Sequence, residues 1–151
     1  MSEAKTADPR LDPRLQAMLS MIPEGEAENV KDRDELLARM NSPESVAAAE
    51  GMVQMMELCD TEEIAPSAGL TIRTESVTSE PDGNQINVQF IRPDSDEQLP
   101  CVYYIHGGGM QTMSCFDGMY RAWGKIIAAQ GVAVAMVDFR NCLVASSAPQ
   151  V

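Results

Sequence analysis

Hydrophobic residues recur at helical spacing through the first third of the chain. Asp12 followed by Pro13 favours a helix start, because the aspartate can cap the helix and proline suits its first position. Pro23 and Gly25 are expected to end this helix. Its apolar stripe, at positions i, i+3, i+4 and i+7, consists of Leu15, Met18, Leu19 and Ile22.

Two further helices are predicted before the first strand. Asp32 and Glu35 have the spacing of a capping box with aspartate as the cap, and Ser42 precedes Pro43 at the next helix start. The apolar stripe of this third helix consists of Val46, Ala49, Val53 and Met56. These helices are rich in methionine, whose flexible side chain fills irregular apolar space. That composition suits either a flexible lid over an acyl pocket or ordinary core packing.

The pattern changes from helices to strands after Pro66. Residues 70–77 and 86–92 are rich in β-branched side chains, and the second segment alternates between apolar and polar positions. The Pro-Asp-Gly-Asn sequence at 81–84 is typical of a turn. The two segments therefore predict an antiparallel hairpin.

Two later segments are apolar at successive positions, which is typical of strands covered on both faces. They are residues 101–105 and 132–137. Between them lies an amphipathic helix that Gly131 is expected to end, and its apolar positions are Met119, Trp123, Ile126 and Ile127. Strand, helix and strand predict a right-handed βαβ unit with parallel strands.

A His-Gly-Gly-Gly sequence, residues 106–109, directly follows the first of these strands. Glycine allows positive φ angles and a close approach of backbone to ligand, so neighbouring N–H groups can point at one anion. A dinucleotide-binding loop would instead space its glycines as G-x-G-x-x-G and open a helix at once. Here residues 110–115 separate the glycines from the next helix, which argues against a nucleotide site.

The HGGG sequence and the Val-Asp-Phe-Arg strand end at 137–140 together resemble the bacterial hormone-sensitive-lipase family of carboxylesterases. The preceding helices, the hairpin and the helix that contains Trp123 also match that family. The resemblance implies an α/β fold, namely the N-terminal portion of an α/β-hydrolase sheet with an antiparallel hairpin, then a parallel βαβ unit. It also implies a helical cap segment over residues 1–65 and a partial α/β-hydrolase core over residues 66–151.

The resemblance assigns roles to the glycine loop. Gly108 and Gly109 would donate the N–H groups of an oxyanion hole, Gly107 would shape the turn, and His106 would be a structural member of the loop. We call residues 106–117 the glycine loop.

Four residues beyond the glycines are further candidates. Met110 and Ser114 are candidates for the substrate pocket, and Asp138 and Arg140 are expected to be structural and could pair to pin loops near the site. Asn141 departs from the family pattern, in which an apolar residue follows the arginine.

The serine nucleophile of such an esterase cannot be placed in this sequence. No Gly-x-Ser-x-Gly occurs, and the single histidine, His106, precedes any serine in the expected order of serine, acid and histidine. Cys115 has no histidine after it that could activate a thiol. The triad is therefore expected to lie outside this chain, and the chain is predicted to be inactive alone.

Composition narrows the possible partners. A net charge of -12 disfavours nucleic acid, and no apolar run reaches the roughly 18 residues of a membrane span. The N-terminal residues lack the apolar core of a secretory signal, so a cytoplasmic location is expected.

Four cysteines without a C-x-x-C pair and one histidine predict no metal site and no cofactor, and Cys101 is expected to be a small core residue.

We therefore expect part of a serine carboxylic-ester hydrolase for small esters with short or medium acyl chains. One alternative is a non-catalytic binding or decoy module, and another is one half of a split esterase. In the family's strand order the segment 101–105 would keep one bare edge, which predicts self-association or pairing with a C-terminal fragment.

Overall fold

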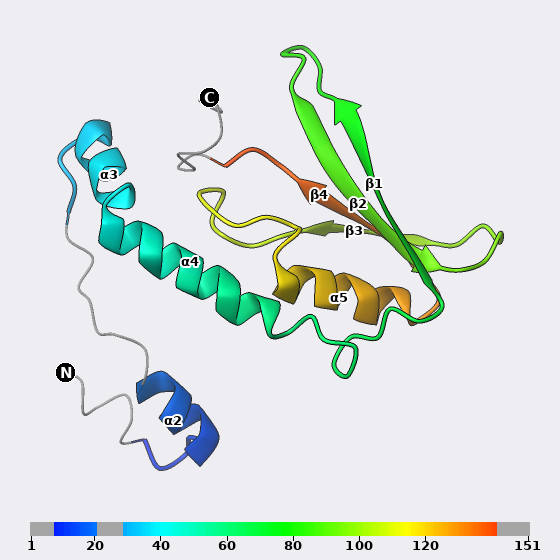
Figure 1. Ribbon diagram of the computed structural model, residues 1–151, viewed down its shortest axis with the longest axis horizontal. Helices are drawn as coiled ribbons and strands as arrows, with labels where there is room; N and C mark the ends of the chain where they lie inside the picture. Colours follow the sequence, from blue (N-terminus) through cyan, green and yellow to red (C-terminus); the bar gives the residue numbers. More distant parts are fainter. Residues whose placement is uncertain (1–7, 21–28, 142–151) are drawn as a thin grey trace. The chain divides into compact units, whose positions relative to one another are not determined.

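A computed structural model describes residues 8–20 and 29–141. Its elements in chain order (Figure 1) are α2 (Pro13–Ser20), α3 (Arg33–Met40), α4 (Pro43–Glu57), β1 (Leu70–Thr78), β2 (Gln85–Pro93), β3 (Cys101–Ile105), α5 (Gly118–Ala128) and β4 (Ala133–Asp138). The chain divides into two compact units, Met1–Glu35 and Leu36–Val151, and each is described by itself. The predicted helix end at Pro23 and Gly25 lies outside the described residues, as does Cys142.

The predicted helix starts are confirmed by their caps. Asp12 accepts a hydrogen bond from the Arg14 N–H at 2.8 Å, one residue after α2 begins. In the same unit, Asp32 accepts from the Glu35 N–H at 2.9 Å. In the second unit, Ser42 accepts from the backbone N–H of the third helical residue of α4 at 3.2 Å. These side chains satisfy N–H groups that a helix start leaves without partners.

The second unit contains a mixed four-stranded sheet in the order β1-β2-β4-β3 (Figure 1). β1 and β2 form the predicted antiparallel hairpin, and β2 continues antiparallel against β4. β3 runs parallel to β4, with α5 connecting them, so the predicted βαβ unit is confirmed. The glycine loop and the end of β4 therefore lie at the same edge of the sheet, because parallel strands end on the same side.

β3 is the edge strand, and its exposure corrects one expectation. Within the described part of the chain it pairs on one side only, and Tyr103 and Ile105 are 62% and 63% exposed. Cys101 was expected in the core, but it is exposed, because an edge strand lacks a neighbour to cover it. An apolar run predicts a buried strand only where the sheet continues on both sides of it.

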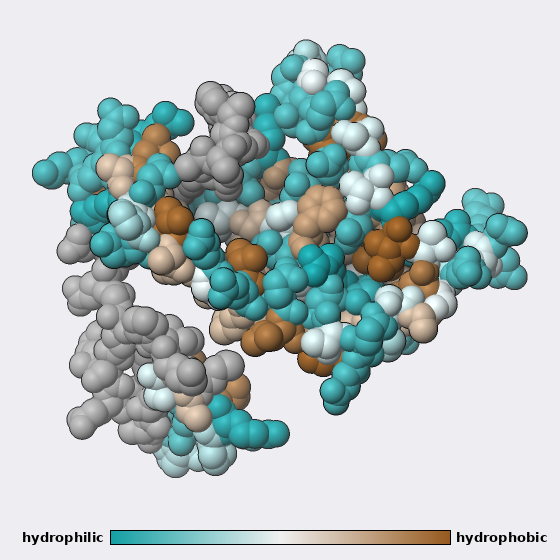
Figure 2. Space-filling view, viewed as in Figure 1, coloured by the Kyte–Doolittle hydropathy of each residue, from teal (hydrophilic) through white to brown (hydrophobic). Residues whose placement is uncertain are grey.

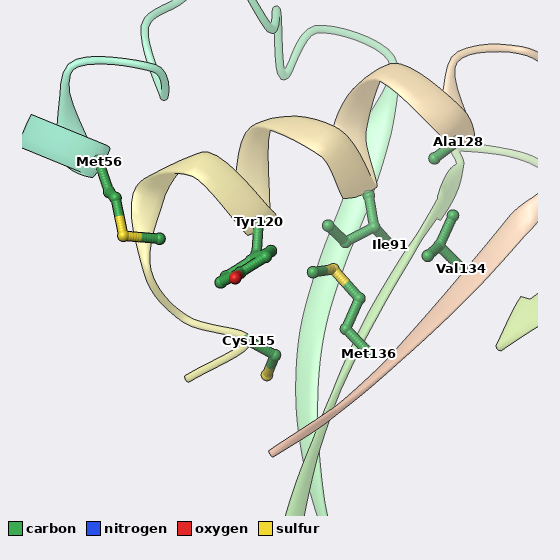
Figure 3. Packing of buried hydrophobic residues seen from close by; sticks show 7 residues of the cluster. All are labelled: Met56, Ile91, Cys115, Tyr120, Ala128, Val134 and Met136. Carbon is green, nitrogen blue, oxygen red and sulfur yellow. The ribbon is translucent and has the colours of Figure 1, made fainter. Parts of the chain in front are cut away.

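The core lies between α5 and one face of the sheet. Figure 3 shows its buried members, which come from α4, the glycine loop, α5, β2 and β4: Met56, Ile91, Cys115, Tyr120, Ala128, Val134 and Met136. A Cβ at Gly124 of α5 would lie 2.4 Å from the Met136 sulfur, so glycine allows the helix to approach the sheet. Burying each large side chain contributes about 1.5–3 kcal/mol, so this cluster fixes α5 over β2 and β4.

A network of charges fastens the end of α4 to α5. The Arg121 guanidinium donates to Glu57 Oε2 and to Asp60 Oδ2, both at 2.7 Å, and Lys125 Nζ forms an ion pair with Asp60 Oδ1 at 2.5 Å. Glu57 Oε1 also accepts from the Gly118 N–H at 2.9 Å, at the first residue of α5. We call Glu57, Asp60, Arg121 and Lys125 the α4–α5 bracket.

The bracket is partly buried, and its charges stabilise one another. Lys125 and Asp60 side chains are 7% and 11% exposed. Burial acts to raise the pKa of Asp60, but the bonds and charges of Lys125 and Arg121 outweigh it and hold that pKa below its ordinary value. Such pairing compensates for the cost of removing these charges from water.

Exposed hydrophobic residues gather near the bracket. Figure 2 shows hydrophilic residues over the tip of the β1–β2 hairpin and hydrophobic residues around α5 and the end of α4. Leu58 and Ile64, which follow α4, are 70% and 55% exposed. On α4 itself Met56 is buried in the core while Met52 and Met55 are exposed. None of the helices in the described ranges is long and apolar enough to cross a membrane.

Candidate functional site

The glycine loop turns sharply as it leaves β3. Gly108 and Gly109 have φ angles of 101° and 61°, and Met110 follows at 61°. The Gly108 carbonyl accepts from the N–H groups of Gln111 at 3.0 Å and Thr112 at 3.3 Å, which closes the turn. In the described part of the chain, neither a carbonyl nor a side chain accepts from the N–H of Gly108 or Gly109. Two backbone donors are therefore available at this edge of the sheet.

Two of the three glycines are also required by close contacts. A Cβ at Gly107 would lie 2.6 Å from the Tyr120 hydroxyl oxygen. A Cβ at Gly108 would lie 2.0 Å from the Thr112 carbonyl oxygen, which is backbone and cannot turn aside. Gly109 has open space around it. The loop is thus packed tightly at its first two glycines and open at the third.

His106 fixes the start of the loop from inside the protein. It is 4% exposed, and its Nδ1 lies 2.8 Å from the Gly107 carbonyl oxygen, so Nδ1 carries the proton and donates. Its ring stacks on Phe139 with centroids 4.2 Å apart and planes 6° apart. Its Nε2 is buried and has no hydrogen-bond partner among the described residues. His106 therefore joins the end of β3 to the end of β4.

The second half of the loop is held by the residues at the end of β4. Ser114 Oγ donates to Asp138 Oδ1 at 2.7 Å and accepts from the Phe116 N–H at 3.1 Å. Asn141 Nδ2 donates to the Met113 carbonyl at 2.6 Å. The Ser114–Asp138 bond and the Asn141–Met113 bond link residues that are 24 and 28 positions apart in the sequence.

Asp117 occupies the N-cap position of α5, where aspartate is a preferred residue, but its side chain does not cap the helix. It accepts from the Ser114 N–H at 3.0 Å instead. The side chain that binds the first N–H of α5 is Glu57, from the α4–α5 bracket. Sequence spacing cannot indicate a cap that comes from a distant helix.

Asp138 and Arg140 bind separate loops and do not pair with each other among the described residues. Arg140 Nη2 lies 2.5 Å from Asp82 Oδ2, in the turn between β1 and β2. Bonds from the Asn84 N–H and the Ser79 side chain, with the charge of Arg140, lower the pKa of Asp82. Asp138 holds the glycine loop through Ser114.

A cavity of about 460 Å³ opens beside these residues. Its lining includes Val53 of α4, Met113 and Ser114 of the glycine loop, and Asp138, Phe139 and Asn141 at the end of β4. Met110, a candidate for the substrate pocket, is 67% exposed and does not line this cavity, whereas Ser114 does. Among the described residues, no group of His, Cys, Asp and Glu side chains could hold a metal ion.

Cys115 lies in the loop but is unsuited to act as a nucleophile. It is fully buried, and burial together with the Asp138 charge raises the pKa of its thiol to about 12. We expect iodoacetamide at neutral pH to modify the exposed Cys101 and to leave Cys115 unmodified in the folded protein. Peptide mass spectrometry would check this, with a denatured sample as the control in which both react. Rapid labelling of Cys115 in the folded protein would contradict its burial.

The structure brings most of the predicted site residues to one edge of the sheet. His106, the three glycines, Ser114 and Asp138 lie there together, and Arg140 extends toward the hairpin turn. Sequence reasoning gave no role to Tyr120, whose hydroxyl meets Gly107 and donates to the Met113 sulfur at 3.2 Å, or to Asn141. The departure of Asn141 from the family pattern was the only signal that pointed to it.

The known proteins to which this chain is similar are esterases. No family model matches the chain. Solved structures of esterase Est22 are 56–57% identical, with TM-scores of 0.85 to 0.87 over 91–95% of this chain. Brefeldin A esterase, a bacterial homologue of human hormone sensitive lipase, is 27% identical over 93% of this chain, with a TM-score of 0.71. Gut esterase 1 of Caenorhabditis elegans is 38% identical over 55 residues, which are 36% of this chain and 10% of that protein.

The chain spans 40–42% of the length of the Est22 structures and 39% of brefeldin A esterase. The part of these α/β-hydrolase esterases that it matches is the N-terminal part. The resemblance and the fold class expected from the HGGG and Val-Asp-Phe-Arg sequences are therefore confirmed.

Proposed function

Since the chain matches the N-terminal part of α/β-hydrolase esterases, we propose that it supplies the oxyanion hole of a serine carboxylic-ester hydrolase. Gly108 and Gly109 are the donors. The observation that carries this proposal is that their N–H groups have no acceptor among the described residues, in a turn that the surrounding backbone fixes. Fixed donors stabilise a developing oxyanion better than water does, because they need no reorganisation.

In this mechanism a serine outside this chain attacks the ester carbonyl. The carbonyl oxygen becomes an oxyanion and accepts hydrogen bonds from the two glycine N–H groups. A third donor would be the N–H after the nucleophile. The triad histidine takes the serine proton and passes it to the leaving alcohol. His106 holds the loop through Gly107 and Phe139 and takes no part in proton transfer.

The substrates proposed are small esters with short or medium acyl chains. Within the predicted helical cap segment, α4 would cover the acyl side of the site. Val53 of α4 supports this assignment, because it lines the cavity beside Ser114 and Asp138. The test uses a chimera that joins this chain to the remaining part of Est22. Its hydrolysis rates would be measured on p-nitrophenyl acetate, butyrate and palmitate, and the acetate or butyrate ester is expected to react fastest. A preference for palmitate would contradict it.

The purified 151-residue chain is expected to show no esterase activity, because it lacks the serine. A chimera in which this chain replaces the matching part of Est22 should hydrolyse p-nitrophenyl acetate, since 56–57% identity preserves most contacts. Hydrolysis by the chain alone would contradict the assignment of the triad to another part. Activity on mixing the chain with the remaining Est22 segment would favour a split esterase. A folded monomer without activity in either mixture or chimera would favour a binding module.

We further propose that β3 pairs with another polypeptide segment. Among the described residues one edge of β3 is unpaired and Tyr103 and Ile105 are exposed, and an apolar edge strand favours pairing with a second chain. Sedimentation of the chain alone should therefore show self-association, and addition of the remaining Est22 segment should replace it with a one-to-one complex. A monomeric chain with a sharp thermal transition would contradict this proposal.

A further inference from the structure

The glycine loop contains a second strained position, at Met113. Its φ is 73°, in the left-handed region that side chains other than those of glycine, asparagine and aspartate seldom adopt. Such a conformation persists only where surrounding contacts hold it. Two contacts do so here. The Tyr120 hydroxyl donates to the Met113 sulfur at 3.2 Å, and Asn141 Nδ2 donates to the Met113 carbonyl at 2.6 Å.

Thr112 and Met113 lie next to Gly108, one of the two proposed donors. A Cβ at Gly108 would lie 2.0 Å from the Thr112 carbonyl oxygen and 3.1 Å from the Met113 Cβ, so these two residues leave no room for a side chain there. The Thr112–Met113 peptide group therefore forms one wall of the turn that orients Gly108. A shift of Met113 must move Gly108 or open the turn.

Asn141 is well placed to fix this wall. It follows β4 at the same sheet edge, and it is half-buried beside the cavity. The bond to Met113 leaves its Oδ1 buried and without a partner among the described residues, so the side chain is held by its donor end. Three residues earlier, Asp138 holds the neighbouring loop residue, Ser114. The residues at the end of β4 thus form hydrogen bonds with two consecutive residues of the loop, Met113 and Ser114.

We infer that Asn141 is a positioning residue of the oxyanion hole, which acts through the Met113 carbonyl to set the orientation of Gly108. This inference rests on the proposed function of the glycine loop. The amide nitrogen of Asn141 is the atom through which its side chain reaches the loop.

The test is Asn141→Leu, which keeps a branched side chain and removes the donor. Hydrogen exchange followed by mass spectrometry should show exchange in peptides covering residues 106–117 rising about tenfold, as expected for the loss of one hydrogen bond. Peptides from β2 and β4 should be unchanged. Asn141→Gln, which retains an amide, should recover part of the protection, and Asn141→Asp should behave like Asn141→Leu. Asn41→Leu is the matched control, because the Asn41 Nδ2 also donates to a backbone carbonyl, that of Leu37 at 2.8 Å, and Asn41 does not line the cavity.

Kinetics of the Est22 chimera provide the second measurement. Asn141→Leu should lower kcat for p-nitrophenyl acetate about tenfold while KM changes little. Displaced N–H donors weaken the hydrogen bonds to the oxyanion, which forms only in the transition state, and leave substrate binding unchanged. Unchanged loop exchange, or exchange that rises equally in β2 and β4, would overturn the inference. Faster loop exchange with unchanged kcat would also overturn it, because Gly108 would then keep its orientation without the Asn141 bond. The proposed function of the loop fails instead if Gly108→Ala retains full kcat, so the two failures are distinguishable.

Discussion

Gly108→Ala should lower kcat of the Est22 chimera by about 100-fold or more, the effect of removing one oxyanion donor. The added Cβ would lie 2.0 Å from the Thr112 carbonyl oxygen, and the φ of 101° is unfavourable for alanine. Both effects force the turn to open, so the N–H of residue 108 or 109 leaves its position. The measurement is the hydrolysis rate of p-nitrophenyl acetate at saturating substrate.

Gly131→Ala is the control for backbone strain alone. Gly131 also has a positive φ, 90°, but a Cβ there meets nothing within 4 Å, and the residue lies before β4, outside the loop. The Gly131→Ala substitution should destabilise the protein modestly and leave kcat unchanged. Equal loss of kcat in the two variants, or full activity of Gly108→Ala, would contradict the assigned role of the loop.

Lys125→Met should destabilise the protein by about 3 kcal/mol, the low end of the usual cost of breaking a buried ion pair, because Arg121 still pairs with Asp60. Lys125 and Asp60 are 7% and 11% exposed, so the remaining carboxylate cannot regain its hydration. Arg121 would be left as its only ionic partner in the bracket. Urea unfolding of the chimera measures the change in free energy, and α4 should separate from α5 first.

Two variants show whether charge pairing is responsible. Arg73→Met breaks the exposed ion pair with Glu75 and should change stability little. The double replacement Asp60→Leu with Lys125→Met should recover much of the lost stability, because it also removes the buried carboxylate that lost its Lys125 partner, while Arg121 keeps its ion pair with Glu57. A loss for Lys125→Met no larger than that for Arg73→Met would contradict the importance of the bracket.

Local pattern was sufficient to predict most of the elements and their order. The alternation in β2, the glycine turn of the hairpin and the caps at Asp12, Asp32 and Ser42 all depend on residues close in sequence, and all are present. The HGGG sequence likewise predicted a loop with positive φ angles, which Gly108 and Gly109 have. These features depend on backbone conformation and on residues close in sequence, so the spacing of residue types along the chain can predict them.

Long-range contacts could not be predicted in the same way. Glu57 reaches Gly118 across 61 residues, and Asn141 reaches Met113 across 28. In the sequence alone, Glu57 and Asn141 would each look like an ordinary polar surface residue. Cys101 was placed in the core because its segment is apolar, although the strand order that the resemblance implies gave this segment a bare edge, and Cys101 is exposed there. Which strand lies at an edge depends on the whole sheet rather than on the strand itself.

A crystal structure of the chimera with a phosphonate ester bound to its serine tests the central proposal most directly. The phosphonyl oxygen mimics the oxyanion, and the account predicts that the backbone nitrogens of Gly108 and Gly109 lie about 2.7–3.1 Å from it. An oxygen that faces solvent or other donors, with both glycine N–H groups turned away, would contradict it.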